Sequence, residues 1–284
     1  MNFRKIKKIF STKPTLEGAG VHLKRAFGFY DVPDFDPFLL LDDFHSNNPD
    51  DYMAGFPWHP HRGIETITYV FYGEVKHGDS LGNSGKIGAG EVQWMTAGSG
   101  IIHQEMPEAN DGLWGVQLWA NLPASHKMMD PRYRDVNAQD IPEVHKDNNK
   151  IHIKIIAGKI DTTEGPVKDI ITEPEYLDIR MDPHSEFVHK IPKGHNAFAY
   201  ILEGEAIFEL HGATIKNEFI VLYKEGEGIQ IRTNDKSVRF LLISGKPIGE
   251  PVAWRGPIVM NTQEELRVAF SEIQKGIFIK HSQK

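Results

Sequence analysis

Two pairs of side chains that commonly bind metals stand out in the sequence. His59 and His61 are one residue apart in "FPWHPHRGIETITYVFYGE", and His103 and Glu105 are one residue apart in "GIIHQEMP". Residues i and i+2 of a β-strand point to the same face, and a proline favours an extended conformation in the residue before it. If both segments are extended and adjacent, three imidazoles and one carboxylate can converge on one ion. This set suits Fe(II), Mn, Ni, Cu or Zn.

The alternative interpretation is that these histidines are ordinary surface or hydrogen-bonded residues, because this spacing also arises by chance. The second pair, which follows the Gly-rich segment "AGSG" further along the chain, favours a metal site. We expect the other histidines, which lack such partners, to be structural or solvent-facing: His22, His45, His77, His126, His145, His152, His184, His189, His195, His211 and His281.

The elements around these residues read as short strands. Segments such as "ETITYVF", "GVQLWANL", "IHIKIIAG" and "VRFLLISG" are apolar or alternating runs bounded by Gly, Pro, Asn or Asp. Many short strands at this spacing predict an all-β sandwich or barrel. One helix is predicted near the C-terminus, in "NTQEELRVAFSEIQKG", with Asn261 or Thr262 as its cap and Gly276 as its end.

The chain also contains a weak internal repeat. Tyr69–Val75 resembles Tyr200–Ala206, and Ala97–Ile101 resembles Glu225–Ile229 in the same order. Together with a length of 284 residues, this predicts two β-domains, one comprising residues 1–138 and the other residues 139–284. The positions that match the four candidate ligands in the second half are Lys190, Pro192, Ile231 and Thr233. We therefore expect only the first domain to bind a metal there.

The composition argues against several classes of protein. The net charge of −7 argues against a general nucleic-acid-binding surface on electrostatic grounds, and the absence of cysteine rules out disulfides and thiolate metal sites. No stretch approaches the ~20 apolar residues of a membrane span. The basic N-terminus lacks the apolar core of a secretory signal, although an organelle address is an alternative. We expect a cytoplasmic protein.

At this point the sequence resembles a known family. "DPFLLLDDF", the segments around the two ligand pairs, "GVQLWANLP" and "GEPVAWRGPIVMNTQEELRVAF" are similar to the pirin family of the cupin superfamily. The resemblance implies a bicupin, with two tandem jelly-roll-like β-barrels and a metal in the N-terminal one. The ligands of the family fall on His59, His61, His103 and Glu105. Most cupins instead take the carboxylate from the first motif, which would be Glu65. Because Glu65 is i+4 from His61, strand alternation would place it on the same face, where it could orient a histidine. The alternative for Glu65 is an ion pair with Arg62 or another cation.

The resemblance also implies a function. Pirins resemble quercetin 2,3-dioxygenases, which open the heterocycle of a flavonol with O₂ and release carbon monoxide. In this view one divalent transition metal, with Fe(II) preferred over Cu, Ni, Mn, Co and Zn, binds the substrate, and Glu105 is the catalytic base. The pocket should be apolar, and Phe56, Trp58, Trp94, Met95, Ile101, Met106 and Trp119 are close to the ligands in sequence.

Two alternatives to this function remain open from the sequence. Some pirins act as regulatory partners of other proteins, and a role of that kind would use the same ligands without turnover. The substrate could also be another metabolite for which quercetin is a lookalike. A monomer is expected, because closed barrels leave no free sheet edges.

Overall fold

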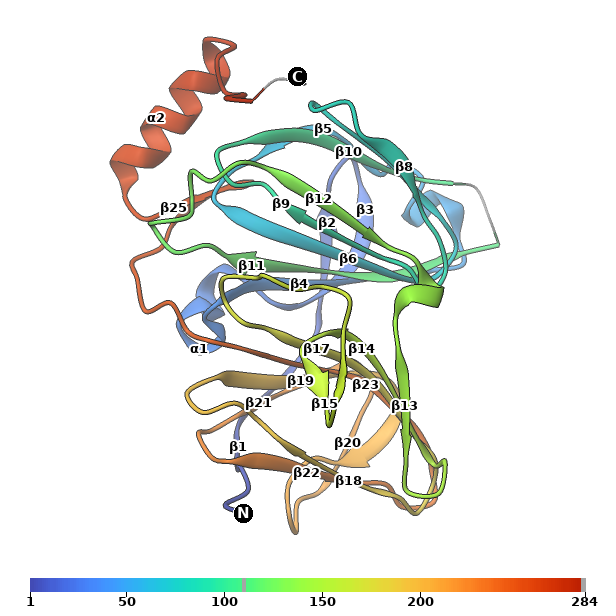
Figure 1. Ribbon diagram of the computed structural model, residues 1–284. Helices are drawn as coiled ribbons and strands as arrows, with labels where there is room; N and C mark the ends of the chain where they lie inside the picture. Colours follow the sequence, from blue (N-terminus) through green and yellow to red (C-terminus); the bar gives the residue numbers. More distant parts are fainter. Residues whose placement is uncertain (109–110, 282–284) are drawn as a thin grey trace. The chain divides into compact units, whose positions relative to one another are not determined.

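The structure is a computed structural model that describes residues 1–108 and 111–281. These residues form two compact units. Unit 1 comprises Met1–Lys13, Pro33–Pro37 and Gln139–Pro247, and unit 2 comprises Pro14–Val32, Phe38–Ala138 and Ile248–Lys284. Strands make up most of the regular structure of both units (Figure 1), so the predicted all-β class is confirmed. The domain boundary between residues 138 and 139 stays a prediction, because these units are defined by packing and do not follow chain order.

Unit 2 contains a sheet of seven strands. Their spatial order is β12 (Arg132–Val136), β9 (Val92–Thr96), β6 (Ile64–Tyr72), β11 (Leu113–Asn121), β4 (Phe38–Ser46), β3 (Val21–Phe27) and β2 (Lys13–Glu17). The central strand β11 pairs antiparallel with both β4 and β6. Short helical turns lie between some of the strands. They are η1 (Phe29–Asp31) and α1 (Val32–Phe35) between β3 and β4, η2 (Pro49–Asp51) after β4, and η3 (Ala138–Asp140) after β12.

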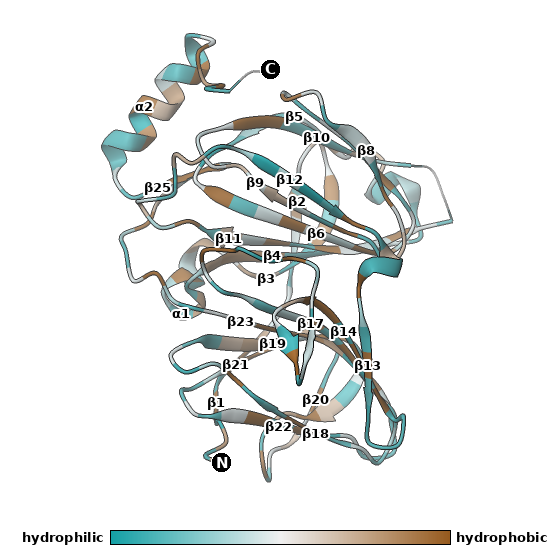
Figure 2. Ribbon diagram, in the orientation of Figure 1, coloured by the Kyte–Doolittle hydropathy of each residue, from teal (hydrophilic) through white to brown (hydrophobic). Residues whose placement is uncertain are grey.

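A smaller sheet of unit 2 carries both ligand pairs. Its order is β5 (Phe56–His61), β10 (Ile101–Pro107), β7 (Val75–Asp79) and β8 (Ser84–Ile87). Side chains of the two sheets share one core: Ile64 and Met95 of the larger sheet pack in one cluster with Ile101 of the smaller one. Hydrophobic and hydrophilic residues alternate along several strands (Figure 2), as expected where one strand face is buried in a core.

The C-terminal segment completes unit 2. It forms the ladder β24 (Ala253–Arg255) and β25 (Ile258–Met260), followed by α2 (Gln263–Gln274), which lies beside β25 (Figure 1). Thr262 is the N-cap: its hydroxyl accepts from the Glu265 amide, and Glu265 accepts from the Thr262 amide, a capping box. Gly276 has φ +68° just beyond the helix. The predicted helix, its Thr262 cap and its glycine stop are confirmed.

Unit 1 is a sheet of ten strands in the described part of the chain. The main path is β1 (Ile6–Ser11), β21 (Phe219–Tyr223), β19 (Asn196–Ile207), β23 (Val238–Gly245), β17 (Glu175–Met181), β14 (Ile151–Ala157) and β13 (Glu143–Lys146). Off this path lie β18 (Glu186–Lys190), β20 (Thr214–Lys216) and β22 (Gly228–Arg232), and a separate ladder joins β15 (Lys159–Ile160) to β16 (Thr163–Glu164).

The repeat seen in the sequence corresponds to matching elements in the two units. β6 of unit 2 is followed by Gly73 at φ +82°, and Gly204, within β19 of unit 1, has φ +72°. Both glycines adopt a left-handed conformation against a neighbouring backbone carbonyl, that of Gly112 and that of Ser237, where a Cβ would clash. In unit 1, Ile231 belongs to a large apolar core cluster. That no metal binds at this place stays a prediction.

No helix in the described residues is long and apolar enough to cross a bilayer.

Candidate metal centre

The pairing of β5 with β10 brings the two ligand pairs together. In the antiparallel register His59 lies opposite His103, and His61 lies opposite Ile101. The register then shifts, and Glu105 lies opposite Phe56, because β5 has one residue more than β10 between these two pairs. β5 is the edge strand of its sheet, and an edge position tolerates Pro57 and Pro60, which cannot donate a backbone hydrogen bond.

Three imidazoles meet at one point of unit 2. The ring centroids are 4.8 Å apart for His59 and His61, 4.4 Å for His59 and His103, and 5.0 Å for His61 and His103. One nitrogen from each ring lies within 4.8 Å of the other two. The Nε2 atoms of His59 and His61 are 3.0 Å apart. Two nitrogens bound at right angles to one ion, each about 2.1 Å from it, would be separated by about 3.0 Å.

The hydrogen bonds of these rings favour metal binding. Nδ1 of His59 is 2.7 Å from the Pro57 carbonyl, and Nδ1 of His61 is 3.1 Å from the Pro257 carbonyl. Since a carbonyl can only accept, each Nδ1 carries the proton and donates it, which leaves both Nε2 atoms with a lone pair. Two lone pairs facing each other at 3.0 Å repel unless a cation lies between them. Both ring nitrogens of the buried His103 lack a hydrogen-bond partner in the described structure, which a metal bond would remedy. The residues therefore fit a bound metal ion.

Burial keeps the histidines in the form that can bind a metal. Removal from water, followed by the neighbouring imidazoles, lowers the pKa of His61 well below 6.5, and the same causes lower the pKa of His103. At pH 7 both rings are therefore neutral and have a free lone pair. An imidazolium would have to lose its proton before it could bind the ion.

The fourth candidate ligand, Glu105, lies two residues beyond His103 on β10 and is not part of this three-nitrogen group. Its side chain is buried, and each carboxylate oxygen accepts one hydrogen bond: Oε1 from the Thr68 hydroxyl at 2.9 Å and Oε2 from Nε2 of Gln117 at 2.8 Å. Gln117 in turn accepts from Nε1 of Trp119 at 3.0 Å. These contacts hold the carboxylate in a fixed orientation. Its role as a ligand stays a prediction.

In the described structure, the Glu65 carboxylate neither orients a histidine nor pairs with Arg62. Its Oε1 accepts from the Thr96 hydroxyl at 2.6 Å, and the guanidinium that was its potential partner, that of Arg62, pairs with Glu272 at 2.7 Å. The strand alternation assumed for Glu65 fails because Gly63, at φ +78°, interrupts the chain between β5 and β6. Thr68, which reaches Glu105, is at odd spacing from Glu65 on β6, so the two side chains point to opposite faces.

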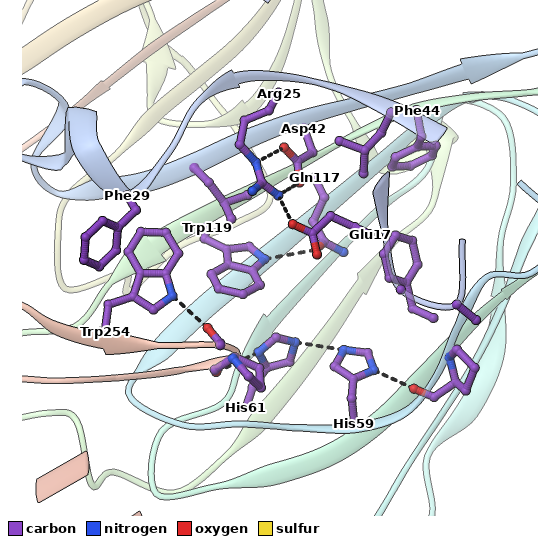
Figure 3. Close-up of a pocket in the computed structure, with 18 residues that line it drawn as sticks. Glu17, Arg25, Phe29, Asp42, Phe44, His59, His61, Gln117, Trp119 and Trp254 are labelled. Atoms are coloured by element: carbon purple, nitrogen blue, oxygen red, sulfur yellow. Dashed lines mark hydrogen bonds and ion pairs between the residues drawn. The ribbon is translucent and has the colours of Figure 1, made fainter. Parts of the chain in front are cut away.

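A pocket of about 600 Å³ opens onto His59 and His61. Figure 3 shows the two histidines on one side of it and the polar residues Glu17, Arg25 and Asp42 on the other. Of the seven apolar candidates from the sequence, Phe56 and Trp119 line this pocket. Trp94, Met95 and Ile101 are buried in the core, and Trp58 is exposed.

Most of the aromatic lining comes from parts of the chain that sequence reasoning did not connect with the site. The Trp119 ring lies 5.8 Å from that of Trp254, which is 5.5 Å from that of Phe29, and the Trp119 ring stands edge-on to His61 at 5.0 Å. Together these rings form an aromatic wall beside the histidines. No local pattern in the sequence could show that residues near positions 29 and 254 meet there.

Arg25 is the cation of the pocket wall, and two carboxylates hold it. It donates to both oxygens of Asp42, at 2.8 and 2.7 Å, and lies 2.9 Å from Glu17. Burial alone would lower the pKa of Arg25. The bidentate contact with Asp42 and the charge of Glu17 outweigh this effect and raise the pKa above its usual value. Because two carboxylates face one guanidinium, this wall carries no excess positive charge and favours neutral or hydroxylated ligands over anions.

Comparisons with known proteins agree with this geometry. A family model described as Pirin matches residues 20–120, and one described as Pirin C-terminal cupin domain matches residues 176–279. A pirin-like protein of Caulobacter vibrioides is 40% identical over 280 residues, covering 98% of this chain and all of the relative.

Solved structures show the same fold. The crystal structure of a quercetin 2,3-dioxygenase from Acinetobacter baumannii has a TM-score of 0.88 and 30% identity, over 97% of this chain and 98% of that one. Bacterial pirin YhhW of Escherichia coli in complex with nickel(II) has a TM-score of 0.65 and 22% identity, over 84% of this chain and 98% of that one, which supports the fold alone. The two family matches and the full-length relative show that this chain is a bicupin and belongs to the pirin family.

Proposed function

We propose that this pirin is a metal-dependent dioxygenase that opens the heterocycle of a flavonol such as quercetin, incorporates O₂ and releases carbon monoxide. The observation that carries the proposal is that His59 and His61, two of the three clustered histidines, line one side of a pocket with an aromatic wall. Its volume of about 600 Å³ is in the range of small-molecule sites, about 300–1,000 Å³. The name of the relative from Acinetobacter baumannii supports the same reaction class.

His59, His61 and His103, with Glu105 as fourth ligand, would hold one divalent ion. When bound, such an ion acts as a Lewis acid for the substrate oxygen and as a template for O₂. Fe(II) is our proposed native metal, and Cu, Ni, Mn, Co and Zn are the alternatives, because imidazole and carboxylate ligands suit all of them.

The residues of the chain have distinct roles in this proposal. Glu105 accepts the proton of the flavonol hydroxyl, while Thr68 and Gln117 hold its carboxylate in place. Trp119 and Trp254 pack on the flat ring system and exclude water from the reacting end. Glu17, whose side chain is 42% exposed, accepts hydrogen bonds from phenolic hydroxyls at the pocket mouth.

The test is aerobic incubation of the metal-free protein with quercetin and each of the six metals in turn. We expect at least one metal to cause loss of the flavonol absorbance together with stoichiometric carbon monoxide. Glu105→Gln should still bind metal through the three histidines, although more weakly, and should lose turnover at saturating metal, because the amide cannot accept the proton. Glu65→Gln is the matched control, since this buried carboxylate bonds Thr96 instead, and it should keep its activity.

Two results would contradict the proposal. If none of the metals supports loss of quercetin although the protein binds them, the dioxygenase function is wrong for this substrate. If Glu105→Gln turns over quercetin at the full rate, Glu105 is not the base, whatever the status of the reaction.

A further inference from the structure

A second group of potential metal ligands lies in unit 1, on the hairpin formed by β13 and β14. Glu143 and His145 are residues i and i+2 of β13, and His152 of β14 lies directly opposite His145 in the antiparallel register. All three side chains therefore project from the same face of the hairpin. One donor atom from each lies within 4.8 Å of the other two.

The distances between the donor atoms match those expected for ligands of one ion. Oε1 of Glu143 is 3.0 Å from Nδ1 of His152 and 3.6 Å from Nε2 of His145. Two ligand atoms bound tetrahedrally to zinc, each about 2.1 Å from it, are separated by about 3.4 Å. The two imidazole centroids are 4.5 Å apart, and the ring planes meet at 71°. Small movements of the side chains would place all three donors around one ion.

A backbone carbonyl fixes which nitrogen of His152 is available. Nε2 of His152 is 3.1 Å from the carbonyl oxygen of Asn149, so this nitrogen carries the proton and donates it. Nδ1 then has a lone pair and faces the Glu143 carboxylate at 3.0 Å. Two electron-rich atoms at this distance need a cation between them, either a second proton on the ring or a metal ion. A carbonyl that orients the far nitrogen of a histidine is also the usual support of a metal-binding imidazole.

The hairpin provides a rigid support for these ligands. Ile151 and Ile153 of β14 are buried in the core of unit 1, and Val144 of β13 packs against the same core. The turn between the strands has three consecutive left-handed residues, Asp147, Asn148 and Asn149, and this sharp turn places the Asn149 carbonyl at the His152 ring. The ligands therefore remain on the outer face, where their side chains are one third to almost one half exposed.

We propose that Glu143, His145 and His152 form a second metal site, which binds a borderline divalent cation of the Zn²⁺ type and leaves one position to water. Two imidazoles and one carboxylate are a ligand set for zinc with an open position. Cu²⁺ should bind more tightly than Zn²⁺ in the same place. Lys154 lies opposite Glu143, and Arg180 of β17 lies opposite His152, so nearby positive charge weakens the site without removing a ligand.

The site is independent of the proposed dioxygenase function, so its test measures zinc binding alone. The metal-free protein is titrated with Zn²⁺ at pH 7.5 in competition with a chromophoric chelator. We expect two equivalents to bind wild type. His145→Gln and His152→Gln should each lose one equivalent, or weaken it at least about tenfold, because one of three protein ligands is missing. His184→Gln is the matched control, since it removes an exposed, carboxylate-paired histidine from the same unit.

A second measurement locates the ion. Added Cu²⁺ should broaden the NMR signals of the hairpin residues 143–154 in wild type and in His184→Gln, and should leave them sharp in His145→Gln. The proposal is wrong if His145→Gln and His152→Gln bind as much Zn²⁺ as wild type with unchanged affinity. That result would mean that the carboxylate and His152 share only a proton.

Discussion

Nδ1 of His61 and the carbonyl oxygen of Pro257 are 3.1 Å apart, although 196 residues separate them in the chain. The C-terminal segment thus orients a candidate metal ligand. The Val259 amide also donates to the Arg62 carbonyl at 3.1 Å, next to the same histidine. The Arg62 side chain is buried, donates to the Ser99 and Phe278 carbonyls and lies 4.2 Å from the Phe278 ring. Metal affinity should therefore depend on residues at the far end of the chain.

Glu272→Gln tests this dependence. The carboxylate lies 2.7 Å from the Arg62 guanidinium, which is only 2% exposed, so its loss leaves a buried charge without its anionic partner. We expect the free energy of unfolding to fall by about 2 kcal/mol. This loss is smaller than that for a fully buried ion pair, because the Glu272 side chain is 18% exposed. Metal affinity at the three histidines should fall by about tenfold as the Pro257 carbonyl becomes less well placed.

Lys280→Met is the control for that variant. Lys280 contacts the same Glu272 from a more exposed position, so its removal should cost less than about 1 kcal/mol. Chemical denaturation measures the stability and competition titration measures the affinity. Unchanged metal affinity in a destabilised Glu272→Gln would show that the C-terminal segment does not orient His61.

Gln117→Leu should weaken metal binding through Glu105. Gln117 donates to the Glu105 carboxylate and accepts from Trp119, so leucine leaves the buried carboxylate and the partly buried indole without this partner. Residues that orient a metal ligand typically change affinity by about 10–100-fold when removed. Gln93→Leu is the control, because Gln93 is a buried glutamine that donates to Asp135 and not to Glu105. Its metal affinity should stay within about twofold of wild type. Equal affinities for the two variants would exclude this role for Gln117.

Lys127 should make the stability of unit 2 depend on pH. Its ammonium is buried and donates to the Gly63 and Val259 carbonyls and to Oδ1 of Asn121. Burial lowers the pKa of Lys127 to about 7 in the folded protein. The unfolded chain therefore binds more protons than the folded one between about pH 7 and the normal lysine value near 10.4, and stability rises with pH across this window.

The measurement is the unfolding free energy of wild type and Lys127→Met at several pH values. Their difference should grow in favour of wild type by about 1 kcal/mol per pH unit between pH 7.5 and 9.5. Comparing two proteins cancels the titration of all other groups. Parallel curves would show that three carbonyl-type acceptors suffice to keep the buried ammonium protonated.

Addition of metal should stabilise the folded protein. The repulsion between the Nε2 lone pairs of His59 and His61 disappears when an ion binds, and only the folded chain assembles the site. At a free metal concentration of about 100 times the dissociation constant, stabilisation should reach about 2.7 kcal/mol. Differential scanning calorimetry with Ni²⁺ and then excess chelator checks this. His103→Ala should show a clearly smaller effect, and an equal effect would place the stabilising ion elsewhere.

The sequence alone indicated the chemistry of the first site, because it depends on local spacing. Once each segment is a strand, the i, i+2 spacings at 59 and 61 and at 103 and 105 place each pair on a common face. The C-terminal helix was equally predictable, because the Thr262 cap, the apolar positions and Gly276 are all local signals.

The tertiary structure decided what lies around those side chains. The register of β5 on β10, the Pro257 carbonyl behind His61 and the Gln117 contact to Glu105 all join residues far apart in sequence. The alternation assumed for Glu65 failed for a similar reason: Gly63 interrupts the strand, and the Val259 carbonyl leaves no room for a side chain there. His145 and His152 looked unpartnered because only strand pairing brings them together. Local spacing determines which way a side chain points along its own strand, whereas its neighbours across the sheet depend on long-range packing.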